Sequence, residues 1–229
     1  MLENFYKVKL RSQVTNAVIA FDVVPDVSET RSVEYKSMNP VHMPGTIYAY
    51  GHTASRLFGI NNARFISRTP QEASYNLAKL NLLRSWTMPY FGQADDDLIG
   101  SPPDVLSFWA FAVGPSANPV LQGGSDNDSP TPPVGSNPEE RVRATHLHNI
   151  PTVIHNLQVT YPSDIDYIPT RADTFQFGTG TRSFTVEVDE GVPMPTIMTT
   201  DVQLYETHSP REFNTFDLER YRTGRLNNF

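Results

Sequence analysis

The sequence contains no cysteine, few charged residues and no long hydrophobic run, and each absence excludes a class of protein. Without cysteine, the 229-residue chain has no disulfide framework, no thiolate metal ligand and no cysteine nucleophile, which suits folding in a reducing cytoplasm. No apolar run approaches the roughly 18 residues that a transmembrane helix needs. Residues 1–9 lack the apolar core of a secretory signal. We therefore expect neither a membrane span nor a secretory signal.

Positive charge is also scarce. Lys and Arg number 18 against 25 Asp and Glu, which gives a net charge of −7, and charged residues make up only 19% of the chain. Tight binding of nucleic acid requires a positive face, so we do not expect it. The composition instead has many turn-forming residues, with 13 Gly and 19 Pro. This favours strands and loops that are held by their neighbours.

One long helix is predicted, from Thr69 to Trp86. Thr69 can act as its N-cap, Pro70 fits the first helical position, and Glu72 completes a Thr-x-x-Glu capping box. Pro89 prevents much continuation, because it disfavours the helical conformation of the residue before it. These signals predict both ends of the helix.

This helix has two apolar arcs at 100° per residue and one narrow polar strip. The first arc consists of Ala73, Leu77, Leu80 and Leu83. The second consists of Tyr75, Leu82 and Trp86, and the polar strip of Ser74, Asn81 and Ser85. One small sheet covers only one arc, so the second requires another partner. We therefore predict a subunit interface formed by Tyr75, Leu82, Trp86, Met88, Tyr90 and Phe91.

The rest of the chain shows the alternation typical of strands. Half-buried strands are predicted at 17–24 and 30–36, and further strands at 46–50, 56–67, 105–113, 152–161, 183–188 and 197–205. The alternation slips at Asn61-Asn62, which indicates a turn or a bulge. A short helix or hook is expected at 213–224. The predicted fold is mainly β, an antiparallel β-sandwich or open barrel with one flanking α-helix.

The segment 114–143 is rich in Pro, Gly, Ser, Asn and Asp and has almost no large apolar residues. Such a segment cannot pack a core. The strand signals on its two sides would pair well without it, so we interpret it as a flexible insertion in a hairpin. Neither half of the chain has a sufficient core by itself, and we expect a single domain over 1–229.

Catalytic motifs are missing from the sequence: it has no nucleophile elbow, phosphate loop or dinucleotide fingerprint. His146 and His148, with His155 nearby, are the best metal candidates, because two imidazoles at i and i+2 of a strand face the same side. No carboxylate pattern completes the set. We expect no catalytic residue, cofactor or metal. Two alternatives stay open: a binding module for a receptor or carbohydrate, and a metal hydrolase using His146 and His148.

Several segments resemble the tail-tube-like proteins of contractile-tailed bacteriophages, in particular the baseplate tube proteins that initiate the tube. The resemblance covers roughly 17–226 without 114–143. It is carried, in order, by the run Arg64-Phe-Ile-Ser-Arg-Thr-Pro-Gln-Glu-Ala73, the run Leu82-Leu-Arg-Ser-Trp-Thr-Met-Pro89, the strand at 105–113, Tyr161-Pro-Ser-Asp-Ile-Asp-Tyr-Ile-Pro169, the strand near Val202, Ser209-Pro210 and 216–224.

This resemblance implies a hexameric ring in the virion tail or baseplate, assembled in the host cytoplasm. Six sheets would join into an inner barrel through which DNA and a tape-measure protein pass, with adjacent tube or baseplate rings as partners. Acidic side chains lining this channel would repel phosphates during passage. The resemblance leaves open whether the chain is the repeating tube subunit or a specialised ring.

Overall fold

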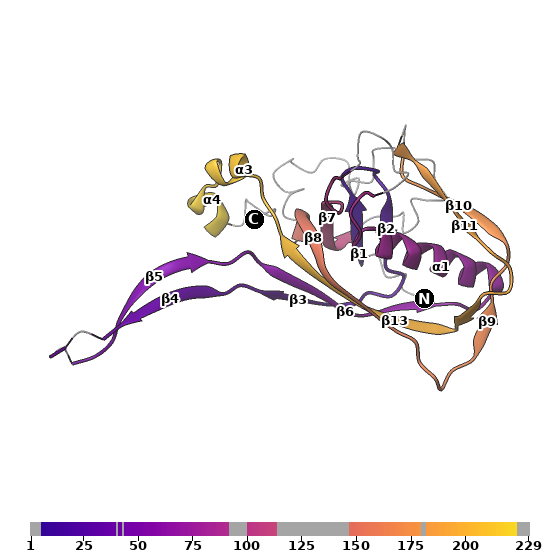
Figure 1. Cartoon of the computed structure of the whole chain (residues 1–229), viewed down its shortest axis with the longest axis horizontal. Coiled ribbons are helices and arrows are strands. Elements are labelled where there is room, and N and C mark those ends of the chain that lie inside the picture. Colours follow the sequence, from indigo (N-terminus) through magenta and orange to yellow (C-terminus); the bar gives the residue numbers. More distant parts are fainter. Residues whose placement is uncertain are drawn as a thin grey trace.

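The computed structural model describes residues 6–39, 41–42, 44–91, 100–113, 147–179 and 182–223. These form a mainly antiparallel β structure with a long flanking helix (Figure 1). The predicted fold class is thereby confirmed. The segment 114–143, His146 and Gly224 lie outside the described residues, so the predictions made for them are not tested.

The main sheet has seven strands in the order β2-β1-β7-β8-β13-β6-β3, and every neighbouring pair is antiparallel. Its strands are β1 (Tyr6–Ser12), β2 (Val18–Ala20), β3 (Asp26–Thr30), β6 (Leu57–Ile66), β7 (Leu106–Val113), β8 (Leu147–Thr160) and β13 (Ile197–Glu206). β7 lies inside the sheet between β1 and β8, as its apolar residues on both parities predict.

Helix α1 (Pro70–Ser85) has the predicted start, with one difference in its cap. The Oγ1 of Thr69 accepts a hydrogen bond from the N–H of Glu72 at 3.2 Å, and Pro70 occupies the first turn. The carboxylate of Glu72, however, accepts from the N–H of Arg68 at 2.7 Å, one residue before the N-cap. Both bonds satisfy N–H groups at the start of the helix, which have no partner within it.

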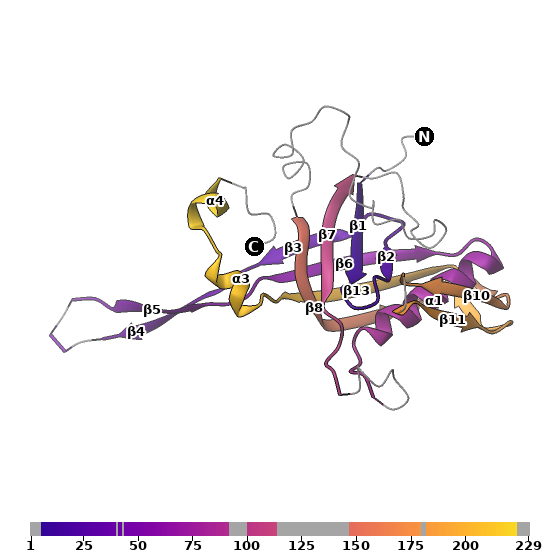
Figure 2. The ribbon, with the colours of Figure 1, turned by 90° about the horizontal axis from the view of Figure 1, so that it is seen from above.

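Two small sheets lie beside α1, at the end of the molecule opposite the arm (Figures 1 and 2). One is the hairpin of β10 (Asp173–Phe177) and β11 (Phe184–Val188), and the other pairs β9 (Tyr167–Pro169) with β12 (Pro193–Pro195). The helix contacts all four of these strands as well as β6. It is therefore enclosed by its own chain on more than one side.

The core lies between the main sheet, α1 and these small sheets. Phe58 of β6 packs on Phe108 of β7 with ring centroids 5.3 Å apart, and Phe65 packs on Phe21 at 5.9 Å. All four rings are almost fully buried. The apolar side chains on the inner face of the main sheet thus form one continuous core.

A long hairpin leaves the body as an arm, formed by β4 (Val33–Met38) and β5 (Ile47–Thr53). It continues the strands β3 and β6 beyond the sheet, as a ribbon of two strands (Figures 1 and 2). The prediction of a half-buried strand at 30–36 is wrong in its burial: every residue of β4 is exposed. Alternation groups residues on one face, but no described residue covers that face.

The slip at Asn61-Asn62 is a bulge within one strand. The register of β6 against β13 shifts between Thr200 and Val202, and Asn62 has a φ of 56°. The backbone N–H of Asn62 donates to Oδ1 of Asp201 at 2.6 Å. Of the two predicted alternatives, the turn is therefore wrong and the bulge is confirmed.

The chain continues from β13 into two short helices, α3 (Pro210–Asn214) and α4 (Leu218–Arg222), where one helix or hook was expected. They lie over the root of the arm (Figure 1). Ser209 and Glu212 form a complete capping box at the start of α3. In the part of the chain that the structure describes, no helix is long and apolar enough to cross a membrane.

Candidate assembly interface

The arm carries a large share of the exposed apolar surface. Of 17 large hydrophobic side chains exposed among the described residues, seven belong to the arm and its loop. They are Val33, Tyr35, Met38, Val41, Ile47, Tyr48 and Tyr50. A two-stranded ribbon is marginally stable by itself in water, and contiguous exposed apolar surface marks sites of interaction. These properties make the arm the candidate site.

One face of the arm is aromatic and uncharged, and we call it the tyrosine face. The register pairs Tyr35 with Tyr50 and Ser37 with Tyr48, so these side chains share a face with Val33. The Tyr35 and Tyr50 rings meet edge to face at 6.1 Å. The three tyrosines are 56%, 68% and 62% exposed at positions 35, 48 and 50. Tyrosine is enriched in interface centres because its ring is apolar and its hydroxyl can hydrogen-bond.

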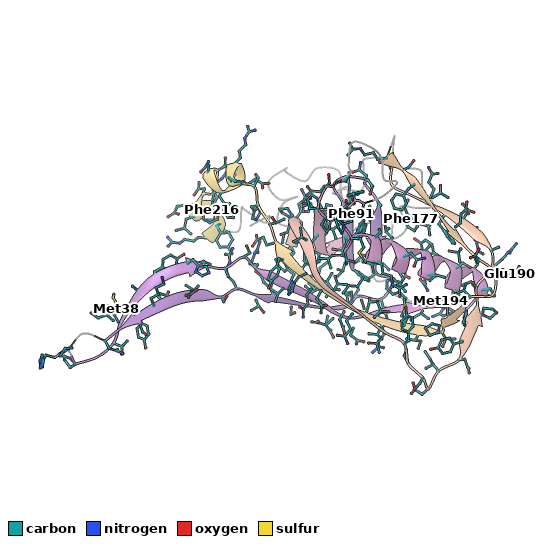
Figure 3. The ribbon with its side chains drawn as sticks, in the orientation of Figure 1. Met38, Phe91, Phe177, Glu190, Met194 and Phe216 are labelled. Carbon is teal, nitrogen blue, oxygen red and sulfur yellow. The ribbon has the colours of Figure 1, made fainter. Side chains whose placement is uncertain are left out.

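The opposite face of the arm is charged at its root and apolar toward its tip. Glu34 and His52 lie opposite each other, with Oε2 and Nδ1 3.3 Å apart, and Lys36 follows on the same face. Met38 and Ile47 pair at the end of the strands. Met38 lies far from the body on the arm (Figure 3). The charges are thus confined to one side of the ribbon.

A cluster of charged and polar side chains, of which Arg56, Glu206 and His208 are buried and Glu29 and Arg31 are partly exposed, lies at the root of the arm, and we call it the charge junction. It consists of Glu29, Arg31, Arg56, Glu206 and His208. Arg56 binds Glu206 through two bonds, Nη2 to Oε1 at 2.7 Å and Nε to Oε2 at 3.0 Å, and its Nη1 donates to Glu29 at 3.1 Å. Nε2 of His208 lies 2.8 Å from Oε1 of Glu206.

The pKa values of the junction follow from this pairing. Burial alone would lower the pKa of Arg56, but hydrogen bonds and charge from Glu206 and Glu29 outweigh it and raise the pKa. Burial would likewise raise the pKa of Glu206, but the bonds from Arg56 and His208 hold it below its ordinary value. Both groups are therefore charged at neutral pH, in the interior of the protein.

The sequence interpretation missed Arg56 and Glu206, although a signal for them exists. Glu206 has the same parity as the buried Val202 and Leu204 in β13. Arg56 has the same parity as the buried Phe58 and Ile60 in β6. Two opposite charges that continue buried rows indicate a buried pair, but only the fold brings together residues that are 150 positions apart.

The predicted interface residues on α1 lie inside the chain. Leu82 is 1% exposed and Trp86 is 2% exposed, so neither has surface left for another subunit. Tyr75 is half-buried against Phe175 of β10, with ring centroids 5.4 Å apart. The second arc was expected to need a second subunit because one sheet covers one side. The small sheets of the same chain supply that cover.

The helix also buries polar groups, which the arcs do not indicate. Ser74, assigned to the polar strip, is fully buried and exchanges hydrogen bonds with the backbone of Arg171. Lys79 is buried with its Nζ 3.0 Å from Oδ2 of Asp22 and 4.3 Å above the ring of Tyr75. Burial lowers the pKa of Lys79, against the opposing charge of Asp22. These partners come from distant segments, so periodicity does not reveal them.

The other predicted interface residues follow α1 and differ from one another. Met88 and Phe91 are exposed, at 66% and 73%, so their surface is open to a partner. Tyr90 is half-buried, and its hydroxyl donates to Oδ1 of Asp104 at 2.5 Å. Oδ2 of Asp104 accepts from Ser12 at 2.5 Å. Tyr90 thus anchors this loop to β1.

The main sheet has one face that the core does not cover, and we call it the open face. Cross-strand partners on β3, β6, β13 and β8 place short polar side chains there. They are Asp26, Ser28, Thr30, Asn61, Arg64, Asn156, Gln158, Thr160, Thr199, Asp201 and Gln203. All are exposed or half-exposed. With two aspartates and one arginine, these polar residues are nearly neutral. Ile197 and Tyr205, both 40% exposed, lie on the same face of β13.

The histidines of the proposed metal site have other neighbours. His148 packs edge to face on Trp109 at 6.4 Å, and burial lowers its pKa. His155 packs on Tyr205 at 4.5 Å. Among the described residues, no group of three or more His, Asp or Glu side chains is arranged to hold a metal ion. His146 is outside these residues.

Comparison with known proteins gives no relative for this chain: no protein-family model matches it, and no curated protein matches it significantly.

Proposed function

We propose that the chain is a structural subunit that assembles through its arm into a hexameric ring of a phage baseplate tube or tail tube. The observation that carries this proposal is the exposed tyrosine face. It lies on a ribbon of two strands that extends from the body, and such a ribbon has no second layer to cover it. A second acidic copy of the chain can approach this face closely, because the face has no charge to repel it. The hexameric order and the tail location come from the resemblance of the sequence.

The open face supports a channel in such a ring. Along β3, β6, β13 and β8, the polar residues named for this face include one arginine, Arg64, and no lysine. This part of the face therefore has few groups that would hold phosphates. This differs from the strongly acidic lining that the net charge suggested. We propose that DNA passes such a surface because nothing on it binds strongly, with only a small contribution from repulsion.

Native mass spectrometry and negative-stain electron microscopy of the purified chain, alone and with neighbouring baseplate proteins, test this proposal. We expect rings of six copies or stacked tubes. A chain that stays monomeric at its highest soluble concentration, also beside those neighbours, would contradict it.

The role of the tyrosine face is tested with paired variants. Tyr48→Ser with Tyr50→Ser should raise the concentration of half-assembly on the order of 30-fold or more. Each central interface tyrosine contributes about 1–2 kcal/mol, and 1.4 kcal/mol is tenfold in affinity. The matched control replaces Tyr161 and Tyr167, two exposed tyrosines off the arm, and should assemble like the parent. Equal loss in both pairs would sink the assignment to the arm.

A second candidate function has support from the same face. Three exposed tyrosine rings on one side of a ribbon also form a platform on which sugar rings can stack. This carbohydrate-binding module would be a monomer whose Tyr48→Ser and Tyr50→Ser variant loses retention on a glycan array. Assembly without glycan binding decides for the ring, and glycan binding by a monomer decides for the module.

A further inference from the structure

The charge junction joins three segments around a single carboxylate. Arg56 lies between β5 and β6, and Arg31 lies between β3 and β4. Each of the two chain segments that enter the arm, which we call its legs, therefore supplies one arginine. Arg56 binds Glu206 directly, and Nη2 of Arg31 lies 3.6 Å from Oε2 of Glu206. Both legs of the arm are therefore tied to the end of β13.

The third segment is the C-terminal pair of helices. Nε2 of His208 lies 2.8 Å from Oε1 of Glu206, and its Nδ1 lies 3.8 Å from Oε2 of Glu212 in α3. The hydroxyl of Tyr221 in α4 accepts from Nη1 of Arg31 at 3.5 Å. Figure 3 shows Phe216, between these helices, above the root of the arm. The helices thus contact the same charges that hold the arm.

The ion pairs of the junction restrict the orientation of the arm more than they stabilise the folded chain. Taking a charge pair out of water costs about as much free energy as the pairing returns, so a buried pair is weak evidence for stability. A two-pronged arginine–carboxylate pair, in contrast, permits one relative orientation of its two segments. Here Arg56 forms such a pair with Glu206, and its third nitrogen is bound by Glu29 of β3.

The backbone of the arm is held at this point by the pairing of two strands. Near the root, Ala54 donates to Ser32 at 2.9 Å between the two legs, and Glu206 donates to the carbonyl of Arg56 at 2.9 Å. A ribbon of two strands bends and twists easily. The side chains of the junction add contacts from this ribbon to β13 and α4.

We propose that Glu206 is a positioning residue: together with Arg56 and His208 it fixes the direction of the arm relative to the body and couples it to α3 and α4. A partner that displaces these helices will then release the arm, and one that binds the arm will order the helices. The inference concerns one chain and does not depend on whether the chain forms rings.

Distance measurement by electron spin resonance tests this in dilute, monomeric protein. The chain has no cysteine, so spin labels can be placed at Val41→Cys in the arm loop and Asn81→Cys on α1, both exposed. The parent should give one narrow distance distribution. Glu206→Gln should broaden it at least twofold. Truncation before Ser209 should broaden it also, because the contacts of His208 with Glu212 and of Arg31 with Tyr221 are lost.

A second ion pair, in which the lysine is buried and the aspartate is partly exposed, provides the control. Lys79 and Asp22 are joined at 3.0 Å, with Lys79 only 2% exposed, and they lie in the body. Lys79→Met should leave the distance distribution narrow even where it lowers the unfolding temperature. A distribution for Glu206→Gln that is as narrow as the parent's, or equal broadening by Lys79→Met, would overturn the proposal.

Two milder variants keep the test decisive if Glu206→Gln does not fold. Arg56→Lys keeps the charge and loses the two-pronged geometry, so it should broaden the distribution nearly as much. Arg31→Ala, at a side chain that is 37% exposed, should give an intermediate width. Narrow distributions for both would show that charge or packing, not the fork geometry, holds the arm.

Discussion

The arm and the body of this protein differ in whether their apolar faces are covered. In the body, each apolar row finds a cover within the chain, including the second arc of α1, where Leu82 and Trp86 are buried. In the arm, the row of Tyr35, Tyr48 and Tyr50 alternates just as regularly and stays exposed among the described residues. The contrast shows that the alternation of apolar and polar residues specifies which side chains share a face, but does not specify which segment packs against that face.

The largest expected effect belongs to the body. Trp86→Ala should lower the free energy of unfolding by about 3–5 kcal/mol, because it leaves a cavity in a closed core. Phe91→Ala is the matched control, since this exposed aromatic residue lies in the same region after α1. It should change the value by less than about 0.5 kcal/mol. Urea unfolding measures both, and similar losses would erase the distinction between the two residues.

Two glycines with positive φ compare the regions directly. Gly178 in the body has a φ of 84°, and an added Cβ would lie 2.5 Å from the carbonyl oxygen of Thr15. Gly45 in the arm has a φ of 124°, with nothing within 4 Å of an added Cβ. Gly178→Ala combines strain with a collision and should cost roughly 2–3 kcal/mol, against about 1 kcal/mol of strain in Gly45→Ala. Equal thermal unfolding midpoints for both would contradict this.

Acid should weaken the junction where arm and body meet. The folded-state pKa of Glu206 lies below its ordinary 4.5, so its contribution to stability is present above pH 4.5 and is lost as pH falls through the folded value. Glu212, whose pKa is also lowered, acts in the same direction. The unfolding midpoint, followed from pH 7 to pH 3, should fall less steeply in Glu206→Gln than in the parent. Parallel curves would exclude this role.

The smallest effect on monomer stability is expected in the arm itself. Tyr48→Ser with Tyr50→Ser should leave the unfolding free energy of dilute protein within about 0.5 kcal/mol of the parent, because these rings are exposed in the monomer. Calorimetry of monomeric samples checks this. A loss above about 2 kcal/mol would mean that the tyrosines pack within the chain, and the contrast between arm and body would disappear.

Local signals in the sequence predicted local features well. The start of α1 depends on Thr69, Pro70 and Glu72, which lie within four residues of one another, and it is confirmed apart from the exact partner of Glu72. The bulge at Asn61-Asn62 was visible as a change of parity. The central position of strand β7 was visible from its apolar residues on both parities. Neighbouring residues suffice to specify these features.

The candidate site was the least predictable part. The sequence interpretation located it on α1, where the structure closes most of the surface, and treated the strands of the arm as half-buried. The burial of Leu82 and Trp86 could not be predicted, because burial depends on segments that are distant in sequence. Phe175 covers Tyr75 from β10, and Glu206 meets Arg56 across 150 residues.

The sequence by itself thus determined which residues share a face, where α1 begins, and that the chain is mainly antiparallel β. These are matters of backbone sterics, capping and side-chain period, and they act over a few residues. Only the tertiary structure decided which faces are covered, that Leu82 and Trp86 of the second arc are internal, and that the exposed arm meets the body at the pair of Arg56 and Glu206. Covering a face requires bringing distant segments together, and their pairing is decided by the packing of the whole chain.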